Sequence, residues 1–122
     1  MLRRKSTLGW MALTACLVLA TAGAALHHGW SNYNQEKPMN LTGTIQAFTY
    51  ENPHGTVRLK TAEDTTWLVI LAPAGRMQNR GLTRDMFKVG GTATVLAYPH
   101  KTIADEARAE RITIGDKTTE LR

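Results

Sequence analysis

Four histidines are the residues of this chain whose type and position suggest metal chemistry. Imidazole nitrogen is a common ligand of copper, zinc and nickel ions. Two of the histidines stand side by side near the start of the chain, and the other two follow prolines in predicted loops. They are His27, His28, His54 and His100. A joint metal site formed by His54 and His100 requires that the fold bring their two loops to one end.

The N-terminal pair supports a sharper hypothesis, because either histidine can become the third residue of a mature chain. Cleavage after Ala24 makes His27 third, and cleavage after Ala25 makes His28 third. A free amine, two deprotonated backbone amides and a third-position imidazole surround Cu(II) or Ni(II) in a square plane. The alternative is that these histidines are solvated residues of a chain terminus. Copper binding is therefore a hypothesis that needs a test of affinity.

The first 25 residues have the composition of a secretory signal peptide. Basic residues at positions 3–5 precede an apolar run over 8–19, and small residues lead to Ala25. We expect this segment to be removed, which predicts a periplasmic protein with no stable membrane insertion after cleavage. Two alternatives stay open, a lipoprotein anchored through Cys16 and an uncleaved membrane anchor. The apolar run is short for a membrane span.

The mature chain has too little net charge to predict a nucleic-acid partner. The whole chain carries +5, but the signal peptide holds three of its 15 basic residues and none of its ten acidic ones. The remaining 97 residues carry +2, which is enough chain for one small domain. We find no paired carboxylates, no Ser/His/Asp arrangement and no phosphate-binding loop in the sequence. We therefore expect an accessory protein that binds rather than catalyses, with a transition metal held by the N-terminal histidines as the first hypothesis. The alternative is an interaction module that docks on an exported protein partner and has no metal role.

Hydrophobic periodicity predicts five strands, a short terminal strand and one helical segment. Alternating apolar and polar residues indicate the strands, and a change of period between Pro73 and Leu82 indicates the helix, which Gly81 ends. The third strand is almost wholly apolar, so we expect both of its faces to be covered. The predicted strands are 41–47, 56–61, 67–71 and 92–98, a fifth marked by Ile112 and Ile114, and a short one after Lys117, with a polar loop over 99–107.

A helix between the third and fourth of five strands is the element order of an OB-type barrel. We therefore predict an all-β fold with one short helix, a small OB-like barrel of five to six strands. The chain divides into a signal peptide over 1–25, an irregular arm over 26–38 and the barrel over 39–122. We expect Trp30 and Tyr33 of the arm to pack against the barrel.

Basic residues recur every four positions through the helical segment. An unbroken helix would align them in one stripe for an anionic partner. Gly81 and Thr83 interrupt the pattern, so a solvated polar face is the alternative. The candidate partner-binding residues are Arg76, Arg80 and Arg84, and Lys88 continues the spacing.

Several short motifs occur in a fixed order along the mature chain. They are the His27–His28 pair, Pro38 with LTGT at 41–44, NPH at 52–54, Trp67, RGLTRD at 80–85, KVG at 88–90 and Tyr98–Pro99. Together they resemble a family of small exported bacterial proteins known as a domain of unknown function. The resemblance covers nearly the whole mature chain and implies a small periplasmic β-barrel with no established activity. In the family the histidine pair directly follows the cleavage residue, whereas here Leu26 intervenes.

Overall fold

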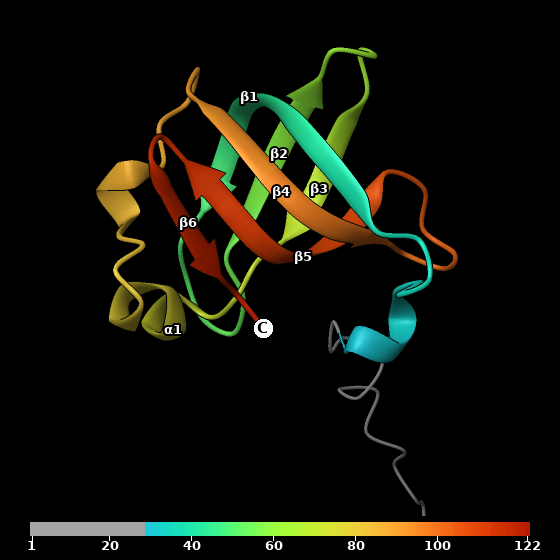
Figure 1. The fold of residues 1–122 in the computed structure, drawn as a ribbon, viewed down its shortest axis with the longest axis horizontal. Helices are drawn as coiled ribbons and strands as arrows, with labels where there is room; N and C mark the ends of the chain where they lie inside the picture. The colour runs from blue at the N-terminus through green and yellow to red at the C-terminus, as the bar shows by residue number, and fades with distance from the viewer. Residues whose placement is uncertain (1–28) are drawn as a thin grey trace, which may run out of the picture.

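Five strands close into a barrel and a sixth extends the sheet in the computed structural model, which describes residues 29–122 (Figure 1). Short helical segments precede the first strand and join the third strand to the fourth. The strands are β1 (Met39–Thr49), β2 (Thr56–Thr61), β3 (Thr66–Ile70), β4 (Thr92–Pro99), β5 (Glu106–Ile114) and β6 (Lys117–Glu120). The helical segments are η2 (Trp30–Asn32), α1 (Ala74–Asn79) and η3 (Arg84–Met86).

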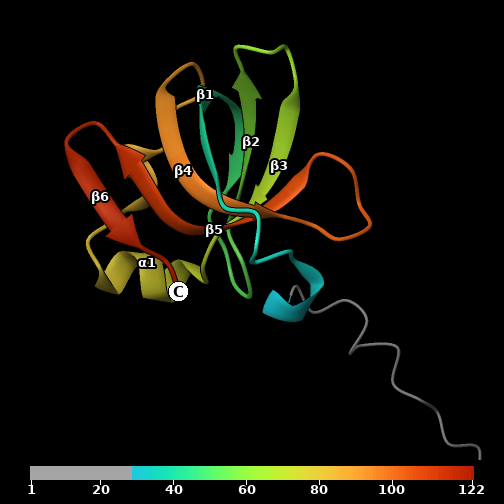
Figure 2. The same cartoon turned by 45° about the vertical axis from the view of Figure 1, so that its right-hand side comes forward.

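The strand order identifies an OB-like barrel. The sheet runs β3-β2-β1-β4-β5-β6 with antiparallel neighbours, and a further parallel pairing of β3 with β5 closes it. The helix α1 lies in the connection from β3 to β4, below β6 in Figure 2. This arrangement confirms the fold class that the element order predicts.

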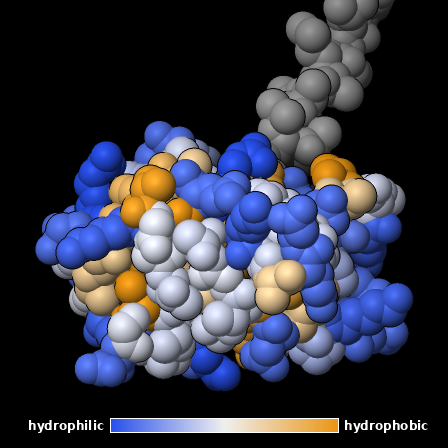
Figure 3. Space-filling model, turned by 90° about the horizontal axis from the view of Figure 1, so that it is seen from above, coloured by the Kyte–Doolittle hydropathy of each residue, from blue (hydrophilic) through white to orange (hydrophobic). Residues whose placement is uncertain are grey.

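Alternation along the strands places the core inside the barrel. Val57 and Leu59 of β2 are fully buried, whereas Arg58 and Lys60 between and after them are exposed. The helical connection adds Met77, Leu82 and Phe87 to the same apolar cluster. Seen from above, the surface shows apolar side chains only in small groups among polar ones (Figure 3).

Two sequence predictions about strands need correction. The fifth strand begins at Glu106, inside the segment predicted as a polar loop, because Ala107 and Ala109 point into the core while charged residues alternate with them. The third strand is covered less completely than its composition suggests. Trp67 and Leu68 remain half-buried. Strands β2 and β5 pair with the backbone of β3, but this pairing does not cover both faces of β3 along the whole strand.

The end of α1 is set by a left-handed glycine, as the sequence predicts. Gly81 has φ +79°, and its N–H donates to the carbonyl of Gln78. The N–H of Leu82 donates to the carbonyl of Met77, which completes the hydrogen-bond pattern of a Schellman motif. Met77 and Leu82 are both fully buried. The motif therefore turns the chain while packing the helix end into the core.

Gly43 is required where β1 crosses β2. A Cβ at this position would lie 2.3 Å from the carbonyl oxygen of Lys60 and 2.7 Å from its carbonyl carbon. The obstacle is backbone, which a rotamer change cannot relieve. Gly75 in α1 serves as the control position, because nothing lies within 4 Å of a Cβ built there and a side chain has room.

We predict that Gly43→Ala lowers the free energy of unfolding by about 1–3 kcal/mol through overpacking. Gly75→Ala should instead raise it by about 0.5–1 kcal/mol, because alanine loses less entropy in a helix. Urea denaturation of the two variants and the parent chain measures both changes. Equal stability of Gly43→Ala and the parent would contradict the close approach of the two strands.

Candidate functional site

The two loop histidines occupy different surroundings. His54 lies in the β1–β2 loop, next to Gly55, whose backbone pairs with Leu71 and Ala72 beyond the end of β3. His100 directly follows β4, where it forms a β-bridge with Tyr33 of the arm. Within residues 29–122, no group of three or more His, Cys, Asp or Glu side chains could hold a metal ion. His27 and His28 lie outside the described residues, so the N-terminal copper hypothesis stays a prediction.

The His100 ring is built into the loop that it begins. Its Nδ1 accepts hydrogen bonds from the backbone N–H groups of Thr102 at 3.1 Å and Ile103 at 3.0 Å. This leaves the proton of the neutral ring on Nε2, which lies 3.9 Å from Oε2 of Glu106. The ring orders the β4–β5 loop and faces a carboxylate.

Glu106 anchors the N-terminal arm on the outside of the barrel. The Tyr33 hydroxyl donates to Glu106 Oε2 at 2.9 Å, and both side chains are buried. The Tyr33 ring also meets the His100 ring edge-on at a centroid distance of 5.1 Å. Burial, followed by the Glu106 hydrogen bond, raises the pKa of Tyr33. Glu106, which falls in the segment predicted as a polar loop, is therefore a buried acid of β5, whereas Tyr33 packs as predicted.

Trp30 extends the same contact along β5. The guanidinium carbons of Arg108 and Arg122 lie 4.5 Å and 4.3 Å from its ring centroid. The Tyr98 ring meets Trp30 at 5.9 Å in an edge-on arrangement. We call this region, made of Trp30, Tyr33, His100, Glu106, Arg108 and Arg122, the arm junction. The alternation of charged residues with Ala107 and Ala109 was the sequence signal that could have identified it.

The candidate arginines do not form one stripe, since α1 ends at Asn79. Arg76 donates to the carbonyl of Leu121 at 3.1 Å, and Arg80 donates to the carbonyl of Glu120 at 2.6 Å. Arg84 lies beyond the glycine turn, with its guanidinium carbon 5.8 Å from the Phe48 ring centroid. Two of the three thus hold the C-terminal segment, and the third flanks an aromatic group.

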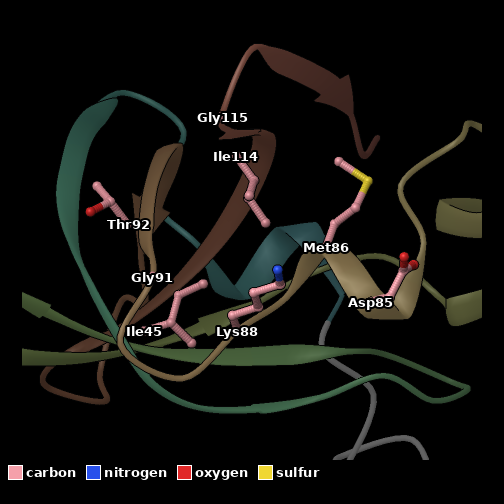
Figure 4. Close-up of a pocket in the computed structure, with 8 residues that line it drawn as sticks. All are labelled: Ile45, Asp85, Met86, Lys88, Gly91, Thr92, Ile114 and Gly115. Carbon is pink, nitrogen blue, oxygen red and sulfur yellow. The ribbon is translucent and has the colours of Figure 1, made fainter.

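Two adjoining surface hollows lie around η3 and share Asp85. One, of about 540 Å³, is lined by Ile45, Met86, Lys88 and Ile114 among others. Figure 4 shows these side chains converging on a space between β1, the loop after η3 and the end of β5, while Asp85 points away from its centre. We call the two together the η3 hollows.

The second hollow, of about 480 Å³, has three aromatic residues in its lining, Phe48, Tyr50 and Phe87. Phe48 stacks on Phe87 at 5.5 Å, and the Tyr50 hydroxyl donates to the Leu82 carbonyl at 2.6 Å. The Thr83 hydroxyl donates to the Asp85 carboxylate, and this hydrogen bond is the main cause that lowers the pKa of Asp85. The aromatic wall is therefore held in place by the fold, next to a charged aspartate.

We predict that Tyr33→Phe lowers the free energy of unfolding by about 1–3 kcal/mol, because it removes the phenol donor from a buried carboxylate. The native fold raises the Tyr33 pKa, whereas the unfolded chain releases the proton near pH 10. The stability from Tyr33 is thus present below about pH 10 and lost as the pH rises further. The pKa values of Tyr50 and Tyr98 are raised as well. Because both tyrosines are present in the parent and in the variant, the difference in their free energies of unfolding reports the contribution of Tyr33.

Urea denaturation at intervals from pH 7 to pH 12 measures that difference. The difference in free energy of unfolding between the parent and Tyr33→Phe should decrease above about pH 10, because Tyr33 ionises in the unfolded parent chain. A difference near zero at pH 7 would show that the arm is not anchored through Glu106.

Comparison with known proteins gives a family but no relative of known activity. Among residues 29–122, no helix has the length and apolar character needed to cross a membrane. Comparison with curated proteins found no match, and comparison with solved structures found none. The model of a family of unknown function (DUF6152) matches residues 14–108, which is most of the chain. The chain therefore belongs to this family of unknown function.

Proposed function

We propose that the protein is an exported accessory protein, acting in the periplasm, that binds a partner protein at the η3 hollows. The observation that supports this most is the pair of adjoining hollows, which have apolar and aromatic walls. Concave surfaces lined by apolar side chains with a few polar groups are the usual form of a binding site. The aromatic wall is preformed, so little ordering entropy is lost on binding.

The charges around the hollows favour one kind of partner segment. Arg84 and Lys88 are exposed at the rim, and Asp85 is the single carboxylate among the lining residues. The net positive rim complements an acidic segment. The occupant is therefore a peptide segment of an exported protein, with an aliphatic or aromatic side chain beside a carboxylate. Of the candidate partner-binding residues, Arg84 then contacts the partner, while Arg76 and Arg80 hold the C-terminal segment.

We predict that a photo-crosslinking residue at Gln78, which lines the aromatic hollow, yields one adduct of discrete mass in the exported fraction of cells. Replacing both Arg84 and Lys88 by Glu should abolish that adduct, because the rim then repels an acidic segment. Arg58→Glu is the matched control, since Arg58 is exposed on β2 away from the hollows. An equal adduct from a crosslinker at exposed Glu63 would contradict the proposal.

A second candidate function is binding of Cu(II) by the N-terminal histidines. The arm that follows them is anchored, because the Asn34 N–H donates to the Pro99 carbonyl and the Lys101 N–H donates to the Asn32 carbonyl. The ring of His100 is already bonded within its loop, so His27, His28 and the free amine would be the ligands.

Native mass spectrometry of the protein recovered from the exported fraction tests export and copper together. We predict a mature chain that begins at Ala25 or Leu26 and takes up one Cu(II) ion more tightly than a short peptide of the same start. Replacement of His27 and His28 by Ala should remove that uptake, whereas His54→Ala should not. Binding no tighter than the peptide would exclude a functional copper site, and acylated Cys16 would show a lipoprotein.

A further inference from the structure

Arg108 is a buried cation on the outer face of the barrel. Its side chain points away from the core, because the neighbouring Ala107 and Ala109 point inward, yet only 8% of it is exposed. The Trp30 ring covers it at 4.5 Å. Among residues 29–122, no carboxylate lies within ion-pair distance of Arg108. The cation–π contact is therefore its main compensation for burial, and it is weaker than a buried ion pair.

The carboxylates near Arg108 along β5 are engaged elsewhere. Glu106 accepts the Tyr33 hydroxyl at 2.9 Å and lies 3.9 Å from the His100 ring. Glu110 accepts the Tyr98 hydroxyl at 3.2 Å and lies 3.6 Å from Arg122. These contacts leave the positive charge of Arg108 without a partner of opposite sign in the described part of the chain.

Two further arginines increase the positive charge at this place. Burial lowers the pKa of Arg108, and the charges of Arg76 and Arg122 lower it further. Arg76 reaches the region from α1, where one of its nitrogens binds the Leu121 carbonyl. Arg122 stacks on Trp30 at 4.3 Å. Three guanidinium groups thus come from three separate parts of the chain, which only the tertiary structure brings together.

The hydrogen-bond donors of Arg108 are open to a ligand. A guanidinium has five N–H donors in a planar fork that matches the oxygens of a phosphate group. Arg108 donates none of them to a residue in the range 29–122, and none of its nitrogens is sealed from solvent without a partner. The Trp30 ring covers one face of the group, while its N–H groups keep some contact with solvent. N–H groups of this kind bind the oxygens of an oxyanion.

We propose that Arg108 of the arm junction is the central ligand of a bound phosphate group, with Arg122 and, from outside the arm junction, Arg76 at the rim. Two negative charges would balance most of the local positive charge, which a single carboxylate would not. The phosphate group belongs either to the free ion or to a small phosphate monoester. This site shares no residue with the η3 hollows, so it stands apart from the proposed function.

Isothermal titration of the full mature chain with inorganic phosphate tests the site, with sodium chloride holding the ionic strength constant. We expect saturable binding of one phosphate per chain. Arg108→Gln should weaken it by at least about tenfold, the value of a charged hydrogen-bond pair. Arg108→Lys should weaken it by a smaller factor, since it keeps the charge but not the fork. Arg58→Gln, which removes an exposed arginine of β2, should change it less than about twofold.

The variants are first compared with the parent by circular dichroism, because Arg108 also packs on Trp30. If Arg108→Gln fails to fold, Arg122→Gln decides the question, with an expected weakening of at least about threefold. A parallel titration with glycerol phosphate distinguishes the free phosphate ion from a phosphate monoester as the ligand. Tighter binding of glycerol phosphate than of inorganic phosphate favours the monoester. Absence of saturable binding in the parent, or equal loss in Arg58→Gln, would overturn the proposal.

Discussion

The parallel pairing of β3 with β5 is the constraint on which the rest of the molecule depends. Leu68, Val69 and Ile70 align with Glu106, Ala107 and Arg108, and this register closes the barrel. It presents the alanine of this β5 segment to the core and its two charged residues to the outside. Because β3 and β5 are far apart in the sequence, loop-closure entropy opposes the pairing until the strands between them have assembled. The outer face of β5 exists as a surface only once that has happened.

The N-terminal arm converts this outer face into a second buried layer. Tyr33 and Ile70 are almost completely buried but do not belong to the apolar cluster inside the barrel. Tyr33 covers Glu106, and Trp30 covers Arg108. A small barrel has little core, so an arm that buries further aromatic area adds stability. The same contact covers the guanidinium of Arg108, so the stability of the arm is linked to the proposed phosphate site.

Much of the fold could be predicted from the sequence, because local patterns there agree with the tertiary structure. The β2 boundaries, the inward faces of β2 and β4 and the glycine that ends α1 all follow from periodicity and backbone preference. The start of β5 was harder to recognise, although Ala107 and Ala109 alternate with charged residues there. Alanine is a weak signal for a core position, and Glu106, Arg108 and Glu110 gave the segment the composition of an exposed loop.

The sequence by itself determined the order of the elements, the OB-like class of the barrel and the histidines and arginines available for chemistry. These depend on residue type and on short-range spacing, which tertiary contacts rarely override when the pattern is strong. Only the tertiary structure decided which of these side chains meet. In the folded chain the His100 ring accepts hydrogen bonds from its own loop, and Glu106 accepts the Tyr33 hydroxyl. The tertiary structure also gathered Arg76, Arg108 and Arg122 from three parts of the chain, because burial and proximity arise from the register of distant strands.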